Sequence, residues 1–346
     1  MFLVYNLILF ISILSCLYIN NWLVLWVLVE LSTMMVVLII SEGSTPRAIE
    51  AASKYFVVQA VASGFLLMGI LSHFFIGNSF IVFGNYDLIS YCLILLGVFV
   101  KLAVLPNPFW FVDVVSGVSL YRAFYVIVAS KVVPVYLFIS LSSQDFLLGL
   151  CLVGLLSVFL GSVLGVNQIS IRKILAFSSI AHMGWMISCF PILSYWCCVV
   201  LFFCYLLMLF PIFFVSSLCS IQGIFKQKNS QFQANVGLVV IVSLLSLGGL
   251  PPLVGFFYKW LMLLGLTGQN LFLVAGILIL MSVISLYYYL SVCYSVFSVY
   301  WAVPQVFCFV NVLVSNSFFF FLGVVSLVNV LVCIFLVGPI IGVWFL

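Results

Sequence analysis

Residues 96–134 read LGVFVKLAVLPNPFWFVDVVSGVSLYRAFYVIVASKVVP. This apolar stretch contains two lysines, Lys101 and Lys131, and a helix-breaking sequence, Pro106-Asn107-Pro108. Proline removes a backbone donor and clashes with the preceding helical turn. In lipid, a broken helix is stable only where protein or a water-filled cavity covers it. A buried lysine beside such a break therefore predicts an ion pathway rather than a hydrophobic anchor.

The composition of the chain is that of a membrane protein. Of the 346 residues, 67% are hydrophobic and 5% are charged, which no water-soluble core needs. The net charge of +4 is small and dispersed, so we expect no nucleic-acid partner. Most cysteines lie in apolar runs without a C-x-x-C pair, so we expect no metal or cluster site. No phosphate-binding loop, haem ligand pair or nucleophile constellation occurs, so we expect neither catalytic residues nor a bound cofactor on this chain.

Apolar runs long enough to cross about 30 Å of hydrocarbon predict an all-α polytopic fold. They form one transmembrane domain, 1–346, with about eleven helices and no soluble domain in any loop. Two spans contain breaks. The predicted spans are 3–19, 22–40, 54–76, 88–115 (broken), 119–141, 145–166, 170–190, 192–220, 234–267 (broken), 270–299 and 316–345.

The charges in the loops indicate how the chain is oriented. Loops on the side of the N-terminus contain the basic residues, whereas loops on the other side contain acidic residues and no lysine or arginine. Basic loops face the compartment of synthesis, and an odd number of spans agrees with this pattern. The basic residues are Arg47, Lys54, Arg122, Arg172, Lys173, Lys226 and Lys228, and the acidic residues are Asp87 and Asp145.

A second helix break is predicted at Gly248-Gly249-Leu250-Pro251-Pro252, ahead of Lys259. It lies five spans after the first break, so the two broken helices run in opposite directions. Interrupted helices in such positions indicate an inverted repeat. We expect a first unit over 88–220, with its break near residue 106, and a shortened second unit over 234–345, with its break near residue 251.

Glu30 and the three lysines Lys101, Lys131 and Lys259 are the strongest candidates for function. Glu30 lies roughly 12 Å into its span, where an acid costs ~2.5–3.5 kcal/mol. It is either a protonated, hydrogen-bonded carboxyl or a partner that modulates a buried lysine. Buried lysines near a carboxylate can exchange charge and pass protons. The alternative is that they snorkel to the interface, but Lys131 lies roughly 18 Å from the start of its helix.

Other ionisable residues have weaker assignments. His182 is mid-span and suited to proton exchange, although a lone histidine is often only a packing residue. Asp113 is expected to pair with Arg122 or with a neighbouring subunit. His73 is expected at the interface.

Several motifs together resemble a known family, the mitochondrially encoded subunit 2 class of the antiporter-like membrane subunits of respiratory complex I, NADH:ubiquinone oxidoreductase. The motifs follow the family's order over residues 22–290, and the last two blocks below are highly specific. They are WVLVELSTMMVV around Glu30, STPRAIEAASKYFVVQAVAS from Ser44, KLAVLPNPFW from Lys101, ASKVVPVYLF from Ala129, RKILAFSSIAHMGWM from Arg172 and LSLGGLPPLVGFFYKW from Leu245.

The resemblance implies an inverted repeat of five-helix units and a role in moving protons. It maps the family's buried glutamate to Glu30, and its broken-helix, central and distal lysines to Lys101, Lys131 and Lys259. NADH, FMN, iron–sulfur clusters and ubiquinone would bind to other subunits of the complex. The implied partners are other membrane-arm subunits, including neighbouring antiporter-like ones, and the lipid of the mitochondrial inner membrane.

The sequence departs from the family at the first break. The family's histidine, proline and glutamate in this segment are replaced by Pro108, Val112 and Asp113. A proton role of that histidine therefore does not carry over. Two other functions share the buried lysines and remain open: a free-standing cation/proton antiporter, and a structural subunit whose polar residues only hold helices together.

Overall fold

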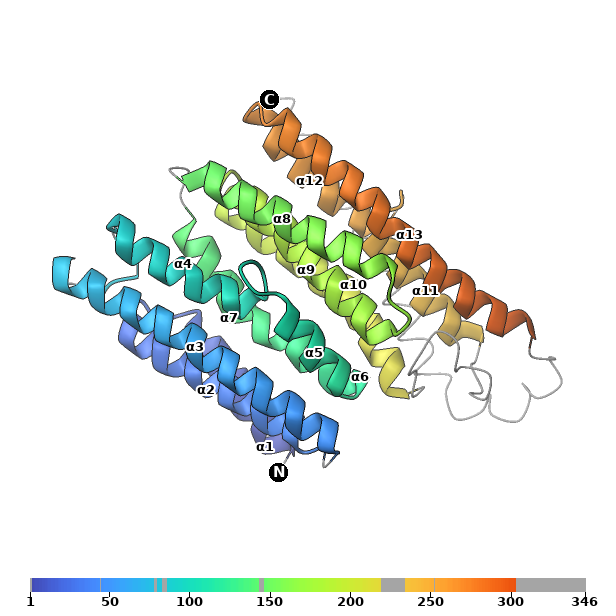
Figure 1. Cartoon of the computed structure of the whole chain (residues 1–346), viewed down its shortest axis with the longest axis horizontal. Coiled ribbons are helices and arrows are strands. Elements are labelled where there is room, and N and C mark those ends of the chain that lie inside the picture. The colour runs from blue at the N-terminus through green and yellow to red at the C-terminus, as the bar shows by residue number, and fades with distance from the viewer. Residues whose placement is uncertain are drawn as a thin grey trace. The chain divides into compact units, whose positions relative to one another are not determined.

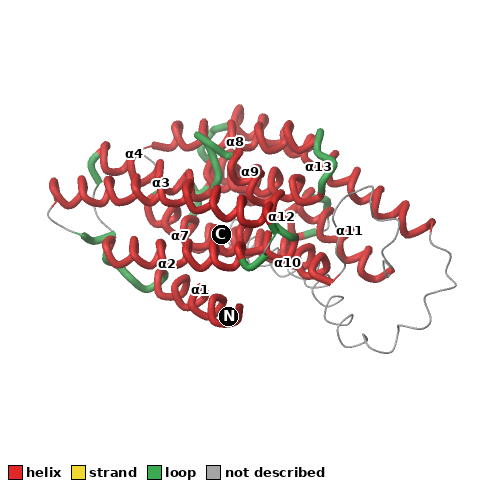
Figure 2. Tube along the Cα trace, turned by 60° about the horizontal axis from the view of Figure 1, so that its bottom comes forward, coloured by secondary structure: helices red, strands yellow, loops and turns green. Residues whose placement is uncertain are grey.

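The computed structural model describes residues 2–43, 45–77, 80–82, 86–142, 146–218, 234–251 and 253–302. Within these residues the chain is helical and has no strand beyond one isolated bridge between Asn21 and Ile81 (Figure 2). Several expected features lie outside the described residues: Pro252, Asp145, Lys226, Lys228 and the span 316–345.

The helices follow the order of the predicted spans (Figure 1). Their bounds are α1 Phe2–Cys16, α2 Trp22–Ser41, α3 Pro46–Gly77, α4 Leu88–Leu102, α5 Phe109–Gly117, α6 Leu120–Phe124, the π-helical turn η1 Tyr125–Ala129, α7 Ser130–Leu141, α8 Leu147–Val166, α9 Ile171–Cys189, α10 Tyr195–Leu218, α11 Ala234–Gly248, α12 Val254–Gly268 and α13 Phe272–Ala302.

Helix α3 begins at Pro46, eight residues before the span expected at 54–76. Proline is favoured in the first helical turn, where its missing N–H needs no partner. Thr45 precedes it, and its side-chain oxygen accepts a hydrogen bond from the Ala48 N–H. The expected i,i+4 ion pair forms on this early turn, with 2.7 Å between Lys54 Nζ and Glu50 Oε1. Hydropathy underestimated the helix because its first turns are polar.

The chain forms two compact units, Met1–Ser157 with Ser179–Pro191, and Val158–Ser178 with Ile192–Leu346. In the first unit, α2 packs on α1 and α3, and α3 packs on α4 and α5. Glycines allow α3 and α4 to approach closely, as is common between membrane helices. A β-carbon added to Gly97 would lie 2.8 Å from the carbonyl oxygen of Ala62.

In the second unit, α11 packs on α10, α12 and α13. The two halves of the second broken helix, α11 and α12, meet at Gly255, where an added β-carbon would collide with the carbonyl oxygen of Ser246. Glycine is therefore required at this crossing. The predicted division into repeats at 88–220 and 234–345 stays a prediction.

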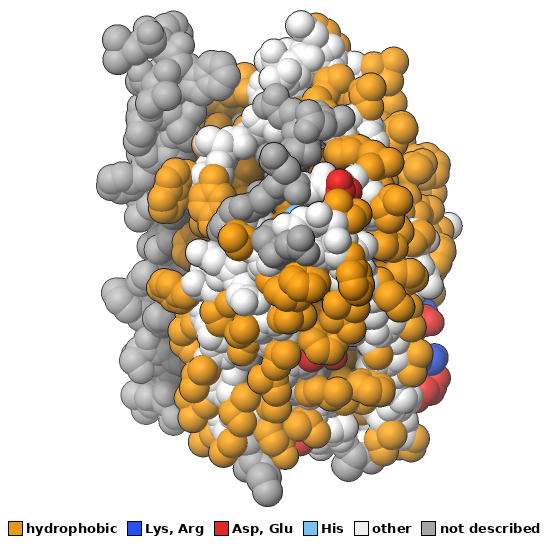
Figure 3. Space-filling model, turned by 90° about the vertical axis from the view of Figure 1, so that its left-hand side faces the viewer, with side chains coloured by type: hydrophobic (Ala, Val, Ile, Leu, Met, Phe, Trp, Pro, Cys, Tyr) orange, Lys and Arg blue, Asp and Glu red, His pale blue; other side chains and the backbone are white. Residues whose placement is uncertain are grey.

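The surface is that of a protein in lipid. Hydrophobic side chains dominate the face seen in Figure 3, and continuous apolar surface of this kind is unusual on soluble monomers. Within the described residues, six helices are long and apolar enough to cross a membrane, and the halves of both broken helices include shorter apolar helices. The chain is therefore a multi-pass helical membrane protein. The six long segments are Trp22–Ser41, Pro46–Gly77, Leu120–Leu141, Leu147–Val166, Tyr195–Phe213 and Phe272–Val296.

Candidate functional site

The first helix break lies between α4 and α5. Ala103, the residue after α4, has a left-handed backbone with φ 59°, and the helix resumes only at α5. Ala103, Val104 and Pro108 are buried, so packed protein covers the two ends of the break, whereas Pro106 and Asn107 between them are exposed. Pro106 and Pro108, which predicted the interruption, both lie in this segment.

Lys101 lies in the last turn of α4, immediately before the break. Its side chain is 1% exposed, and its Nζ is 3.8 Å from Oε1 of Glu30 on α2, whose side chain is 23% exposed. This distance is too long for a hydrogen bond but short enough for strong attraction. A buried charge without a partner is costly, so the structure supports the reading of Glu30 as a partner of a buried lysine.

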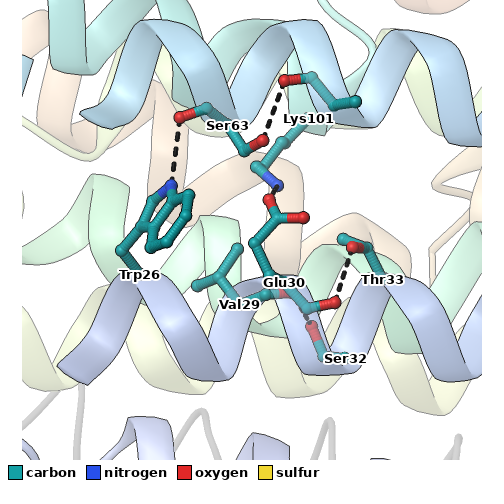
Figure 4. A network of polar contacts seen from close by, with 8 residues as sticks. Trp26, Val29, Glu30, Ser32, Thr33, Ser63 and Lys101 are labelled. Atoms are coloured by element: carbon teal, nitrogen blue, oxygen red, sulfur yellow. Dashed lines mark hydrogen bonds and ion pairs between the residues drawn. The ribbon is translucent and has the colours of Figure 1, made fainter. Parts of the chain in front are cut away.

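Other polar groups of α2 and α3 lie near the Glu30–Lys101 pair (Figure 4). Figure 4 shows Glu30 reaching from its helix towards Lys101, with Ser63 of α3 beside the lysine. Trp26 Nε1 donates to the Ser63 carbonyl oxygen at 3.1 Å, and Thr33 Oγ1 donates to the Glu30 carbonyl oxygen at 2.8 Å. The first bond joins α2 to α3 beside the pair, and the second lies within α2 at the backbone of Glu30.

Lys131 lies in the first turn of α7 and is 1% exposed. Its Nζ is 4.4 Å from the centroid of the Phe111 ring of α5, and it has no hydrogen-bond partner within the described residues. An aromatic face attracts a cation. The helix expected over 119–141 contains the π-helical turn η1 directly before Lys131, a distortion that is frequent at functional sites. Neither Phe111 nor the π-turn was identified from the sequence, because no local motif marks them.

Lys259 connects the two halves of the second broken helix. Helix α11 ends at Gly248, Gly249 has φ +83°, and α12 begins after the exposed Pro251. The buried Lys259 Nζ on α12 donates a hydrogen bond to the Gly248 carbonyl oxygen at 2.8 Å. Carbonyls at a helix C-terminus carry partial negative charge and favour a cation. The sequence placed Lys259 near a break, but only the fold shows which carbonyl it binds.

The remaining ionisable candidates have different positions. His182 is buried in α9, inside the first unit. His73, near the C-terminal end of α3, is also buried and packs on the Tyr86 ring at 4.7 Å between centroids, and its position at the membrane interface stays a prediction. It lies where α3 packs against the segment before α4, which covers it. Asp113 is exposed, and no ion pair joins it to Arg122 in the described part of the chain.

The structure therefore gathers some of the predicted residues. Glu30, Lys101, Lys131 and His182 all lie in the first unit, whereas Lys259 lies in the second. Among the described residues, no three His, Cys, Asp or Glu side chains lie together so as to hold a metal ion. What the first unit can offer chemically is a partly exposed carboxylate and two buried amines, groups that hold or release protons.

Comparison with known proteins identifies the family. The family model described as NADH:quinone oxidoreductase/Mrp antiporter, TM, matches residues 19–285, a range that includes Glu30, all three lysines and both breaks. The chain belongs to this family. The resemblance expected from the sequence over residues 22–290 is therefore confirmed at the level of the family.

The chain is similar over most of its length to relatives named NADH-ubiquinone oxidoreductase chain 2. It is 35% identical over 279 residues to NADH-ubiquinone oxidoreductase chain 2 of Polypterus ornatipinnis, covering 80% of each chain. With chain 2 of Xenopus laevis it shares 34% identity over 278 residues, again covering 80% of each. With chain 2 of Patiria pectinifera it shares 33% identity over 279 residues, covering 80% of this chain and 78% of the relative.

Solved structures share the fold of this antiporter-family chain. A chain in respiratory complex I from Thermus thermophilus matches with a TM-score of 0.78 and 24% identity, covering 85% of this chain and 70% of that one. A chain in the Mrp complex from Dietzia sp. matches with a TM-score of 0.76 and 16% identity, covering 83% and 59%. The fold is thus one that both kinds of assembly use.

Proposed function

We propose that this chain is a proton-translocating membrane-arm subunit of respiratory complex I. In this role it couples NADH oxidation and ubiquinone reduction, which occur on other chains, to proton transfer inside its own helices. The support is the family match, together with relatives named NADH-ubiquinone oxidoreductase chain 2 that align over four-fifths of the chain.

The observation that carries this proposal is the Glu30–Lys101 pair beside the first helix break, with Nζ 3.8 Å from Oε1. At this separation a small movement of the half-helix changes how strongly the carboxylate attracts the ammonium, because Coulomb energy varies inversely with distance. A conformational signal can therefore alter whether Lys101 keeps its proton. Lys131, His182 and Lys259 would receive and pass on the charge in turn.

The redox chemistry would lie elsewhere in the complex. NADH, FMN, the iron–sulfur clusters and ubiquinone would be held by other subunits, and this chain would contribute to NADH:ubiquinone reductase only as a proton-moving subunit. Its partners would be other membrane-arm subunits, including neighbouring antiporter-like ones.

For the location we propose the mitochondrial inner membrane, with eleven spans and an inverted repeat around the two broken helices. The N-terminus would lie in the matrix and the C-terminus in the intermembrane space. The basic loops, such as those with Arg47 and Arg172, support this orientation through the positive-inside rule.

The test is Lys101→Met in the assembled complex, with Lys54→Met as the matched control. Methionine keeps most of the length of lysine but holds no proton, and Lys54 is an exposed lysine in the same unit. We expect Lys101→Met to lower proton pumping and NADH-driven turnover while Lys54→Met stays at the wild-type level. Equal activity of the two variants would contradict the proposal. It would mean that Lys101 has only a structural role.

A second candidate is a free-standing cation/proton antiporter, which the likeness to a chain of the Mrp complex favours. Native gel electrophoresis separates the two functions. A complex I subunit migrates with a very large assembly that oxidises NADH, whereas an antiporter migrates without NADH dehydrogenase activity and exchanges cations for protons in vesicles.

A further inference from the structure

Two adjacent tyrosines of α13, Tyr288 and Tyr289, turn into the second unit. Each is 1% exposed, whereas the preceding Tyr287 is 64% exposed, because successive side chains on a helix point about 100° apart. The rings of Tyr288 and Tyr289 lie 4.6 Å apart between centroids. Neither buried hydroxyl makes a hydrogen bond of good geometry to another described residue. The pair thus places two unsatisfied phenols in the interior.

Two serine hydroxyls lie beside the phenols, Ser178 of α9 next to Tyr289 and Ser285 of α13 next to Tyr288. Each serine already donates its proton to a carbonyl of its own helix, at 2.9 Å for Ser178 and 2.7 Å for Ser285. Their oxygen lone pairs stay available as acceptors. Both serines are buried. The interior of the second unit therefore contains a cluster of hydroxyl groups with unused donors and acceptors.

Leaving a buried hydroxyl unsatisfied costs roughly 1–3 kcal/mol. A buried water typically forms about three hydrogen bonds to polar groups that would otherwise lack partners. The two phenols supply donors and acceptors, and the two serines supply acceptors, which is the set that holds such a water. The hydroxyl cluster, Tyr288, Tyr289, Ser178 and Ser285, thus offers the donors and acceptors that a buried water needs.

The hydroxyl cluster lies next to the second helix break. The Tyr289 ring packs against Gly248, where an added β-carbon would be 3.7 Å from Tyr289 Cδ2. The Gly248 carbonyl is the group that holds Lys259. The Lys259 amine and the Tyr289 ring therefore lie against the same residue, Gly248, the amine on its carbonyl oxygen and the ring through Cδ2.

On its other side the cluster reaches the end of α8. A β-carbon added to Gly165 would lie 2.9 Å from Tyr288 Cε1, and α8 ends one residue later at Val166. Asn167, in the turn between α8 and α9, is exposed. The phenols thus extend from the second helix break towards a surface turn that carries the basic residues Arg172 and Lys173 just beyond it.

We propose that the hydroxyl cluster binds water and connects Lys259 with the surface at the α8–α9 turn, as a proton-access branch for this lysine. Each hydroxyl accepts a proton on its oxygen from one side and releases its own proton to the next acceptor. The hydroxyls and the water are neutral again at the end, and one proton has moved between the turn and Lys259, whose amine gains or loses one charge. The inference rests on the proposed function, because it needs Lys259 to exchange protons.

The test replaces each phenol by phenylalanine, which keeps the ring packing and removes only the hydroxyl. Tyr288→Phe, Tyr289→Phe and the double variant are compared in the assembled complex with Tyr287→Phe, the exposed neighbour on the same helix. We expect Tyr287→Phe to behave as wild type. The double variant should lower NADH-driven proton pumping roughly fivefold, which corresponds to about 1 kcal/mol on a rate-limiting barrier.

Two further measurements keep the outcome unambiguous. Lys259→Met is assayed in parallel: if it lowers pumping while the double phenylalanine variant matches the Tyr287→Phe control, the access branch is wrong and the proposed function stands. If Lys259→Met also leaves pumping unchanged, the role of this lysine in the proposed function fails. A high-resolution density map of the wild-type complex should show ordered water among the four hydroxyls. A dry cluster overturns the inference even if the double variant does not assemble.

Discussion

Replacing Glu30 by glutamine tests the ion pair at the first helix break. The change keeps the shape of the side chain and removes the negative charge of the carboxylate, whose Oε1 lies 3.8 Å from Lys101 Nζ. Because the Glu30 side chain is partly exposed, an effective dielectric constant of about 20 applies, and the lost attraction is ~4 kcal/mol. If half of this energy enters the rate-limiting barrier, turnover falls roughly 30-fold, since each 1.36 kcal/mol changes a rate tenfold.

The assay is NADH-driven proton pumping in reconstituted complex, normalised to the amount assembled. Glu50→Gln is the matched control, because it makes the same chemical change at an exposed glutamate of the same unit. We expect Glu50→Gln to pump at the wild-type rate. A rate for Glu30→Gln equal to that control would refute the reasoning.

A double-mutant cycle separates the pair from its two members. Residues in direct contact show interaction energies, whereas independent residues have additive effects. If Glu30 acts through Lys101, the variant with both Glu30→Gln and Lys101→Met should pump about as slowly as Lys101→Met alone. Additive losses would mean that Glu30 acts on something other than Lys101.

Three other outcomes are expected. Lys259→Met should assemble but pump more slowly, because methionine cannot hold a proton or donate to the Gly248 carbonyl; unchanged stoichiometry and rate would make Lys259 structural. Gly97→Ala should destabilise the contact between α3 and α4 by about 1–3 kcal/mol, because its β-carbon meets the Ala62 carbonyl. It should lower the thermal denaturation temperature, whereas Gly64→Ala, with open space around an added β-carbon, should not. In intact mitoplasts, external protease should not cleave the loop over 222–233, and cleavage there would reverse the proposed orientation.

The sequence by itself determined the class of the protein and the order of its helices. Long apolar runs can be stable only across lipid, where each helix satisfies its own backbone, so the order of the described helices followed from composition and length, whereas the count of eleven spans stays a prediction. Proline and glycine act through local backbone sterics, so the positions of both helix breaks also followed from the sequence. The start of α3 did not, because its first turns depend on a polar cap rather than on hydropathy.

Only the tertiary structure decided which buried groups meet. Glu30 and Lys101 are 71 residues apart, and nothing local to either residue indicates a separation of 3.8 Å. The same holds for the Phe111 ring at Lys131 and for the Gly248 carbonyl at Lys259. The helical repeat lets the sequence predict which residues share one face of a helix. Which other helix contacts that face depends on how the helices pack. The burial of His73 and the meeting of four hydroxyls at Tyr288 and Tyr289 were decided in this way, by packing between segments far apart in the chain.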